Sequence, residues 1–199
     1  MRVISIGTAC NVKHQIDEHF GKLKTLFFDW LMVDIMSVID LLKCKSIEDI
    51  LNIDTVKVDP VTPIVQNNSR VLITSLPCCI SIHDVPINPT DNDINDFIDK
   101  YKRRYMRIIE YIHSNEKVYF IKYGHIDELY KQMFIEAVQA INKDCDFLLV
   151  NINISQPKSN FITNKFWLEI NLTDIPPVDS DWKTSYLDWK TIFNTMTNF

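Results

Sequence analysis

The stretch Lys117–Asn153, "KVYFIKYGHIDELYKQMFIEAVQAINKDCDFLLVNIN", decides the fold class. It opens with the apolar run KVYFIKYG and closes with CDFLLVNIN, and both runs have the composition of buried strands. The segment between them, IDELYKQMFIEAVQAIN, has the length and pattern of a helix. A strand, a helix and a second strand of these lengths predict a right-handed crossover between two parallel strands.

The same alternation continues on both sides of this stretch. RVISI near the start and FWLEINL near the end are predicted strands, RVLIT and CCISIHD are two more joined at SLP, and a final helix is expected from about Ser185 to Met196. We therefore predict one α/β domain over residues 1–199, a three-layer arrangement of mostly parallel strands with helices on both faces. The residues expected in its central strands are Ile4, Phe120, Leu149 and Leu168.

Composition and charge exclude several classes of protein. The net charge is −5, which disfavours a general nucleic-acid-binding protein. The basic run Lys100–Arg107 lies in a helical pattern flanked by acids, and we interpret it as a solvated helix face rather than a phosphate-binding surface. No apolar run approaches the roughly 18 to 20 residues of a membrane span, and the first residues are too short for a signal peptide. We expect an intracellular, cytoplasmic protein, with its five cysteines reduced.

Cys10 is the first candidate for chemistry. The strand RVISI ends at Gly7, Cys10 follows three residues later, and NVKHQIDEHF then has helical spacing. In an α/β sheet, ligands bind where strands end and helices begin. The partial positive charge of a helix N-terminus favours a thiolate, and its free N–H groups could hold an oxyanion. A small buried side chain that only starts a helix is the alternative.

A nucleophilic thiol usually needs a histidine base, and His83 is the best candidate among the five histidines. It is expected at the end of the strand CCISI, where a side chain is both held and accessible. His125, after Gly124 at another strand end, is expected at the same edge of the sheet. The remaining three, predicted on helix surfaces or at a helix end, are His14, His19 and His113.

Two acids are candidates for orienting the histidine. Asp84 follows His83 directly, and an adjacent residue cannot easily turn back onto its neighbour's ring. Asp29 lies inside the apolar run FFDWLM, where a charge is costly unless it is paired or hydrogen-bonded. Asp29 could cap a turn through backbone N–H groups, or it could face His83 or substrate; we favour the second hypothesis.

Four segments in this order, ISIGTAC, FFDWLM, SIHD and DKYKRRYMRIIEYIHSNEKVYFIKY, resemble an uncharacterised family of papain-like cysteine peptidases found in bacteria and large DNA viruses. The family pattern is similar to a strand ending in Gly-Ser-Asn-Cys, then Pro-Phe-Asp-Trp, then His-Asp. The resemblance implies that Cys10 is the nucleophile and His83 its histidine, and that Phe28, Asp29 and Trp30 form the Phe-Asp-Trp signature. Thr8 and Ala9 replace the family's Ser and Asn, and Phe27 replaces Pro. The resemblance also implies an α+β papain-like fold as the alternative, and the host cytoplasm as the location if the protein is viral.

The sequence therefore predicts a cysteine-dependent hydrolase that uses Cys10, His83 and an orienting Asp29 or Asp84. Its substrate, a peptide or a small molecule, would be bound by Gly7, Thr8, Asn11, Phe28, Trp30 and His125. No cofactor, metal, nucleic acid or membrane partner is expected. Two alternatives stay open: a nucleotide or sugar-nucleotide binding module, since the first strand ends where Rossmann-like domains bind phosphate, and a catalytically inactive interaction protein. A zinc site made of Cys78, Cys79 and His83 is disfavoured because these residues lack paired CxxC spacing.

Overall fold

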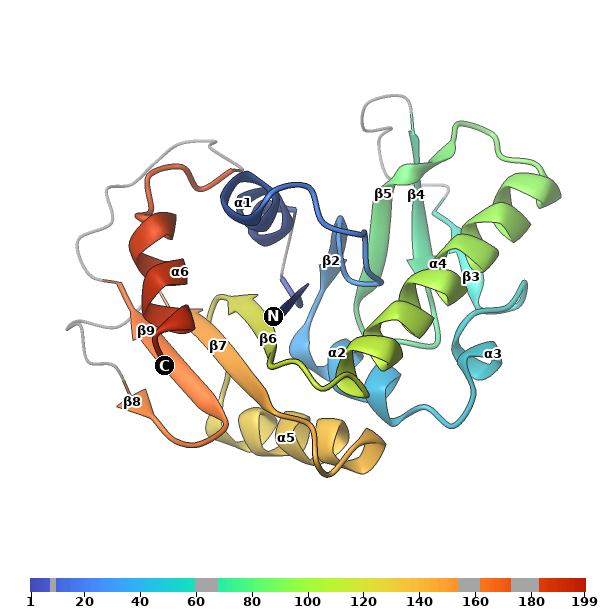
Figure 1. The fold of residues 1–199 in the computed structure, drawn as a ribbon. Helices are drawn as coiled ribbons and strands as arrows, with labels where there is room; N and C mark the ends of the chain where they lie inside the picture. The colour runs from blue at the N-terminus through green and yellow to red at the C-terminus, as the bar shows by residue number, and fades with distance from the viewer. Residues whose placement is uncertain (8–9, 60–67, 154–161, 173–182) are drawn as a thin grey trace.

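The computed structural model describes residues 1–7, 10–59, 68–153, 162–172 and 183–199. Its first layer is a five-stranded sheet with the order β1-β6-β7-β9-β8 (Figure 1). Four of these strands are parallel and β8 is antiparallel to β9. Their bounds are β1 Arg2–Ser5, β6 Val118–Tyr123, β7 Phe147–Asn153, β8 Ile162–Thr163 and β9 Trp167–Asn171. The parallel pairing predicted from Lys117–Asn153 is confirmed.

Helices cover both faces of this sheet because its strands are apolar on both sides. Phe120 points toward α5 (Glu128–Ile141), where its ring lies 5.0 Å from that of Phe134. Its neighbours Tyr119 and Ile121 point to the opposite face, into a cluster with residues of α1 (Asn11–Phe20) and α6 (Trp189–Thr197). The three-layer arrangement is therefore confirmed, and Ile4, Phe120, Leu149 and Leu168 are all buried. Ile4 lies in an edge strand of this sheet rather than in a central one.

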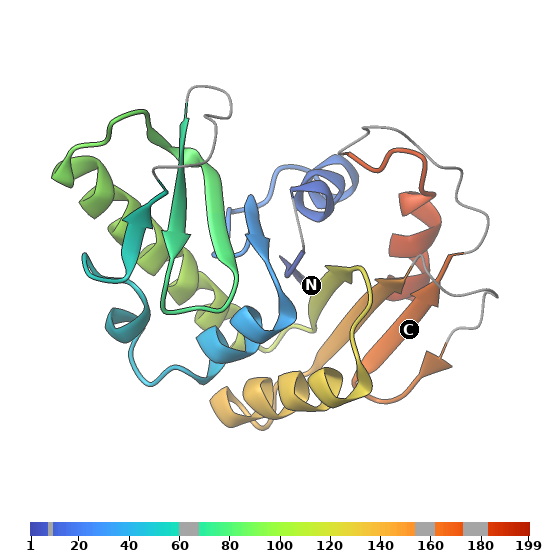
Figure 2. The same ribbon diagram turned by 180° about the vertical axis from the view of Figure 1, so that it is seen from behind.

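A second, antiparallel sheet with the order β2-β5-β4-β3 is built from the chain between α1 and β6 (Figure 2). Its strands are β2 Leu31–Val33, β3 Val56–Val58, β4 Asn68–Ile73 and β5 Cys79–Pro86. The long helix α4 (Asp91–Ile112) runs across it (Figure 1), and the chain between β2 and β3 forms α2 (Ile35–Lys43) and α3 (Ile47–Ile50). The strands predicted at RVLIT and CCISIHD are β4 and β5. The fold is thus a mixed α/β fold in which one hydrophobic cluster runs from Phe120 of the parallel sheet to Val71 of the antiparallel one.

Aspartate caps set where two of the helices begin. α2 begins at Ile35, because Asp34 is the cap and its carboxylate accepts from the Ser37 N–H at 2.7 Å. The last helix begins at Trp189, not near Ser185, because Asp188 caps it. Within the described ranges, no helix has both the length and the apolar composition to cross a bilayer.

Candidate active site

Cys10 lies at the cap position of α1, directly after the edge strand β1. Its Sγ is 3.5 Å from Nε2 of His83, which is within the hydrogen-bond limit for sulfur. The thiol is partly buried, and burial raises its pKa; the negative charge of Asp84 acts in the same direction, while the Cys10 backbone N–H opposes it. The raised pKa runs opposite to the thiolate expected at a helix N-terminus, and burial is its largest cause. A neutral thiol facing an imidazole results.

His83 lies inside β5 rather than at its end, and an irregularity of the strand directs it. Ser69 of β4 pairs with Val85, whereas Val71 pairs with Ser81, so β5 has two extra residues between these pairs. His83 and Asp84 are in this bulge. A bulge breaks the alternation of a strand and re-aims its side chains, which is why bulges recur beside active sites. Here it allows two adjacent side chains to reach different partners, His83 toward Cys10 and Asp84 toward α4.

Asp84 does not hydrogen-bond to the His83 ring. Its carboxylate accepts from Lys100 Nζ at 2.8 Å, from Tyr101 Oη at 2.5 Å and from Ser81 Oγ at 2.8 Å, and Arg104 Nη2 lies 3.8 Å away. Burial would raise the pKa of Asp84, but the bonds from Lys100 and Tyr101 and the nearby Arg104 charge bring it below its usual value. Asp84 is thus an ionised anchor that ties the bulge to α4.

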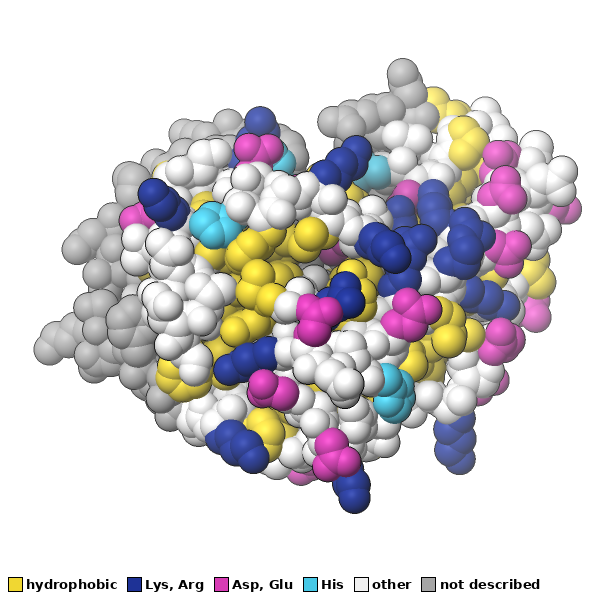
Figure 3. Space-filling view, viewed as in Figure 1, with side chains coloured by type: hydrophobic (Ala, Val, Ile, Leu, Met, Phe, Trp, Pro, Cys, Tyr) yellow, Lys and Arg dark blue, Asp and Glu magenta, His cyan; other side chains and the backbone are white. Residues whose placement is uncertain are grey.

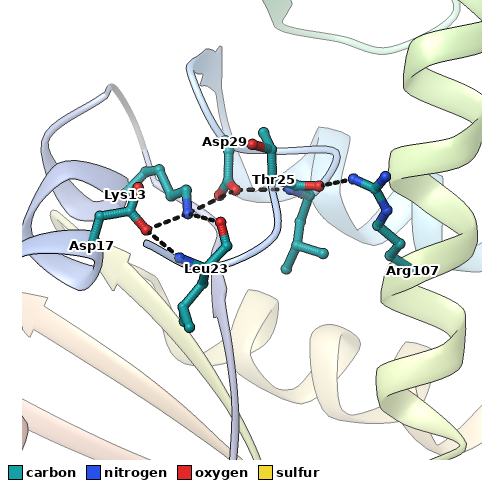
Figure 4. Close-up of polar contacts among 7 residues, drawn as sticks. Lys13, Asp17, Leu23, Thr25, Asp29 and Arg107 are labelled. Atoms are coloured by element: carbon teal, nitrogen blue, oxygen red, sulfur yellow. Dashed lines mark hydrogen bonds and ion pairs between the residues drawn. The ribbon is translucent and has the colours of Figure 1, made fainter. Parts of the chain in front are cut away.

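Asp29 is also directed away from His83, into a buried polar cluster between α1 and the segment before β2 (Figure 4). Its Oδ2 accepts from the Leu26 N–H at 2.8 Å and lies 3.7 Å from Lys13 Nζ. Lys13 also bonds Asp17 at 2.7 Å. Across the residues described, neither Asp29 nor Asp84 contacts the His83 ring, so the orienting role expected for them has no direct contact to support it.

The turn that contains Asp29 places the aromatic side chain of Trp30 beside Cys10 and His83. The N–H of Asp29 donates to Leu26, the N–H of Leu31 donates to Phe28, and Arg107 of α4 donates to the Thr25 carbonyl at 2.7 Å (Figure 4). At its end Trp30 has a φ of 65°, a conformation that is strained for a bulky side chain.

The Trp30 indole meets the His83 ring edge to face, with centroids 6.5 Å apart. The preceding Phe28 is buried in the core. Phe28 and Trp30 were both predicted to bind substrate. Trp30 lies beside the Cys10–His83 pair, whereas Phe28 is buried in the core under the turn.

The other predicted binding residues divide into two groups. Gly7 is buried before Cys10, and Asn11 is the first residue of α1, with its side chain accepting from the Val12 N–H at 2.8 Å. Thr8 lies outside the described residues. His125 is exposed and pairs with Asp127 at 3.0 Å at the start of α5, and no contact with Cys10 or His83 places it in this site.

Four residues that complete the surroundings of the site were missed by sequence reasoning. They are Lys13, Lys100, Tyr101 and Arg104. Lys100, Tyr101 and Arg104 lie within one turn of each other on α4. This helical spacing of cations, together with the acid Asp84 in SIHD, was the one signal in the sequence that could have indicated these contacts. The contacts of Lys100, Tyr101 and Arg104 depend on how α4 packs against β5, and this packing cannot be predicted from a local sequence pattern.

Asp29 makes a testable contribution to stability. Burial raises the pKa of Asp29 to about 7 although Lys13 and the Leu26 N–H oppose this. Between about pH 4 and 7 the folded protein then binds one proton more than the unfolded chain, so the free energy of unfolding falls as pH rises, by up to about 1.4 kcal/mol per pH unit, and the loss is complete above pH 7. We expect Asp29→Asn to remove this slope in urea unfolding between about pH 5 and 8, while the exposed-site control Asp99→Asn keeps it. An unchanged slope in Asp29→Asn would mean that another group titrates.

Comparison with known proteins places the chain in a family. Residues 1–157 match the model of a family described as "Putative papain-like cysteine peptidase (DUF1796)". The chain belongs to this family. No curated protein and no solved structure matches the chain. The region matched by the family contains Cys10, His83, Asp29 and Asp84, together with the antiparallel sheet and α4.

The zinc hypothesis fails on geometry. Cys79 is buried in the hydrophobic core, and the described ranges contain no group of three or more His, Cys, Asp or Glu residues that could hold a metal ion. The adjacent Cys78 contacts α2 through its backbone, with its N–H donating to Ser37 Oγ at 2.8 Å. Of the candidate sites considered from the sequence, the Cys10–His83 pair is the one with supporting geometry.

Proposed function

We propose that this family member is a cysteine hydrolase that cleaves peptide-like acyl compounds with Cys10 as nucleophile and His83 as general base. The observation that carries the proposal is the 3.5 Å approach of Cys10 Sγ, at the start of α1, to Nε2 of His83, in β5. A thiol and an imidazole at this distance match the nucleophile–base arrangement of covalent catalysis.

The chemistry follows from the pair. His83, with its ring proton on Nδ1, takes the proton of the Cys10 thiol at Nε2 while Sγ bonds to the substrate carbonyl carbon. The intermediate collapses, the carbon–leaving-group bond breaks, and the leaving group takes the proton from His83. Water, deprotonated by the same imidazole, then attacks the thioester and releases the acid and the Cys10 thiol.

The N-terminus of α1 supports the charge that develops on the carbonyl oxygen. Unpaired N–H groups of a first helical turn point outward along the helix axis and carry partial positive charge. The Val12 N–H is already bonded to Asn11, whereas the Asn11 N–H, next to Cys10, has no acceptor among the described residues and is available as a donor. No orienting carboxylate among the described residues contacts the His83 ring; instead, the Trp30 indole packs against this ring and limits its rotation.

The test is covalent trapping with a peptidyl epoxysuccinate, an electrophile that reacts with catalytic cysteines. We expect one equivalent on Cys10 in peptide mass spectrometry, at a rate at least about tenfold above that of the partly exposed Cys78. Cys10→Ser should abolish the fast reaction, and the matched control Cys78→Ser should keep it. Equal rates at both cysteines would contradict the proposal and favour a binding protein.

A further inference from the structure

The cations of α4 form one stripe along the helix. Lys100, Arg103, Arg104 and Arg107 recur at positions i, i+3, i+4 and i+7, which places them on one face. Figure 3 shows Lys and Arg side chains gathered over α4. The interpretation of this run as a simple solvated face was incomplete, because Lys100 and Arg104 meet Asp84 and Arg107 meets the Thr25 carbonyl.

The positive charge of this stripe is only partly compensated. Within the described ranges, Asp84 is the one carboxylate within 4.0 Å of Lys100 or Arg104, and Arg103 and Arg107 have none. Among the described residues, the acids of α4 make no ion pair within 4.0 Å with the stripe; they are Asp91, Asp93, Asp96, Asp99 and Glu110. Asp84 is thus the one described acid in direct contact with these four cations, and Nη1 of Arg104 is buried without an acceptor among the described residues.

The stripe is continuous with the site on which the proposed function rests. Asp84, which binds Lys100 and Arg104, is the neighbour of His83 in the same bulge. Its charge is also felt at the Cys10 thiol, where it raises the pKa. Arg107 holds the turn that presents Trp30. The site is therefore bordered by an excess of positive charge on the α4 side, although the whole chain has a net charge of −5.

We propose that the α4 stripe selects acidic peptides, with an Asp or Glu side chain of the substrate held near the exposed Arg103 while its carbonyl group reaches Cys10. This inference deepens the proposed function and rests on it. An arginine with no carboxylate partner is free to form a bidentate pair with a substrate carboxylate. The surrounding cations raise the local concentration of anionic substrates, and salt weakens the effect.

The experiment compares two chloromethyl ketone tripeptides that differ only in carrying Glu or Gln at the residue before the reactive group. In each, Sγ of Cys10 bonds to the methylene carbon, chloride leaves, and the thiol proton passes to His83. We expect the Glu probe to inactivate the protein about five- to tenfold faster than the Gln probe at low salt, and the ratio to approach one in about 0.5 M NaCl.

Arg103→Gln tests the residue itself. It is exposed and, among the described residues, makes no ion pair with Asp84, so we expect the ratio of the Glu-probe rate to the Gln-probe rate to fall about threefold or more. The control Lys190→Gln, an exposed cation on α6, should change neither rate. Equal rates for both probes would overturn the acidic-peptide inference while leaving the hydrolase proposal intact. Failure of both probes to label Cys10 would overturn the hydrolase proposal and the inference that rests on it.

Discussion

Replacing His83 with alanine is expected to slow the acylation of Cys10 by p-nitrophenyl acetate by about a hundredfold or more at pH 7. Burial raises the pKa of the Cys10 thiol, so the sulfur is protonated at rest and must lose its proton during the attack. His83 Nε2, at 3.5 Å, is the base in position to take it. The measurement is the initial burst of p-nitrophenolate under single-turnover conditions.

Two controls separate this effect from a general disturbance. His125→Ala removes an exposed histidine that pairs with Asp127 outside the site, and its burst rate should equal that of the wild type. Thermal unfolding of His83→Ala should show the wild-type melting temperature within a few degrees, because the ring is partly exposed and its one described hydrogen bond is to sulfur. A normal burst in a folded His83→Ala protein would mean that His83 is not the base.

The second large effect is expected from Asp84→Asn, which should lower the free energy of unfolding by about 2–4 kcal/mol. The substitution keeps the shape of the side chain but leaves Arg104, and in part Lys100, without a counter-charge in a region with little access to water. Because Asp84 ties the bulge to α4, we also expect His83 to lose its alignment and the burst rate to fall about tenfold. Urea unfolding and the p-nitrophenolate burst measure the two quantities on one protein.

Matched variants show which contact of Asp84 matters. Tyr101→Phe removes one hydrogen bond to the carboxylate and should cost about 1 kcal/mol. Asp59→Asn, which removes the carboxylate next to β3 that lies 3.7 Å from Arg70 of β4, should cost less than Asp84→Asn. If Asp84→Asn were no more harmful than Asp59→Asn, the anchoring role would be wrong.

Much of the parallel sheet could be predicted because its signals are local. The runs around Phe120 and Leu149 are apolar and are separated by one segment with helical spacing. The spacing of their apolar residues and the length of each segment are therefore enough to predict two parallel strands joined by a helix. The antiparallel sheet was only partly predicted. RVLIT and CCISIHD indicated two strands, but β2 is three residues long and follows the turn around Asp29, and its pairing with β5 is set by tertiary contacts.

The candidate site divides in the same way. Cys10 at a strand–helix junction was visible in the sequence, and the structure places His83 against it. The partners of Asp29 and Asp84 were not visible, because they depend on Lys13 one helix away and on the packing of α4 against β5. The bulge that contains His83 and Asp84 has no signature in SIHD, because the register between β4 and β5 is not encoded in these four residues.

The 3.5 Å separation of Cys10 and His83 has a mechanical consequence, because the two residues belong to different parts of the fold. Cys10 caps α1, whereas His83 lies in β5, so the distance between Sγ and Nε2 depends on how α1 packs against the antiparallel sheet. A relative displacement of about 1 Å is enough to reduce catalysis strongly. Under the proposed function, a substrate that contacts both α1 and α4 would hold the pair at this distance. Mild denaturant that loosens this packing is expected to abolish the acylation of Cys10 before either sheet unfolds.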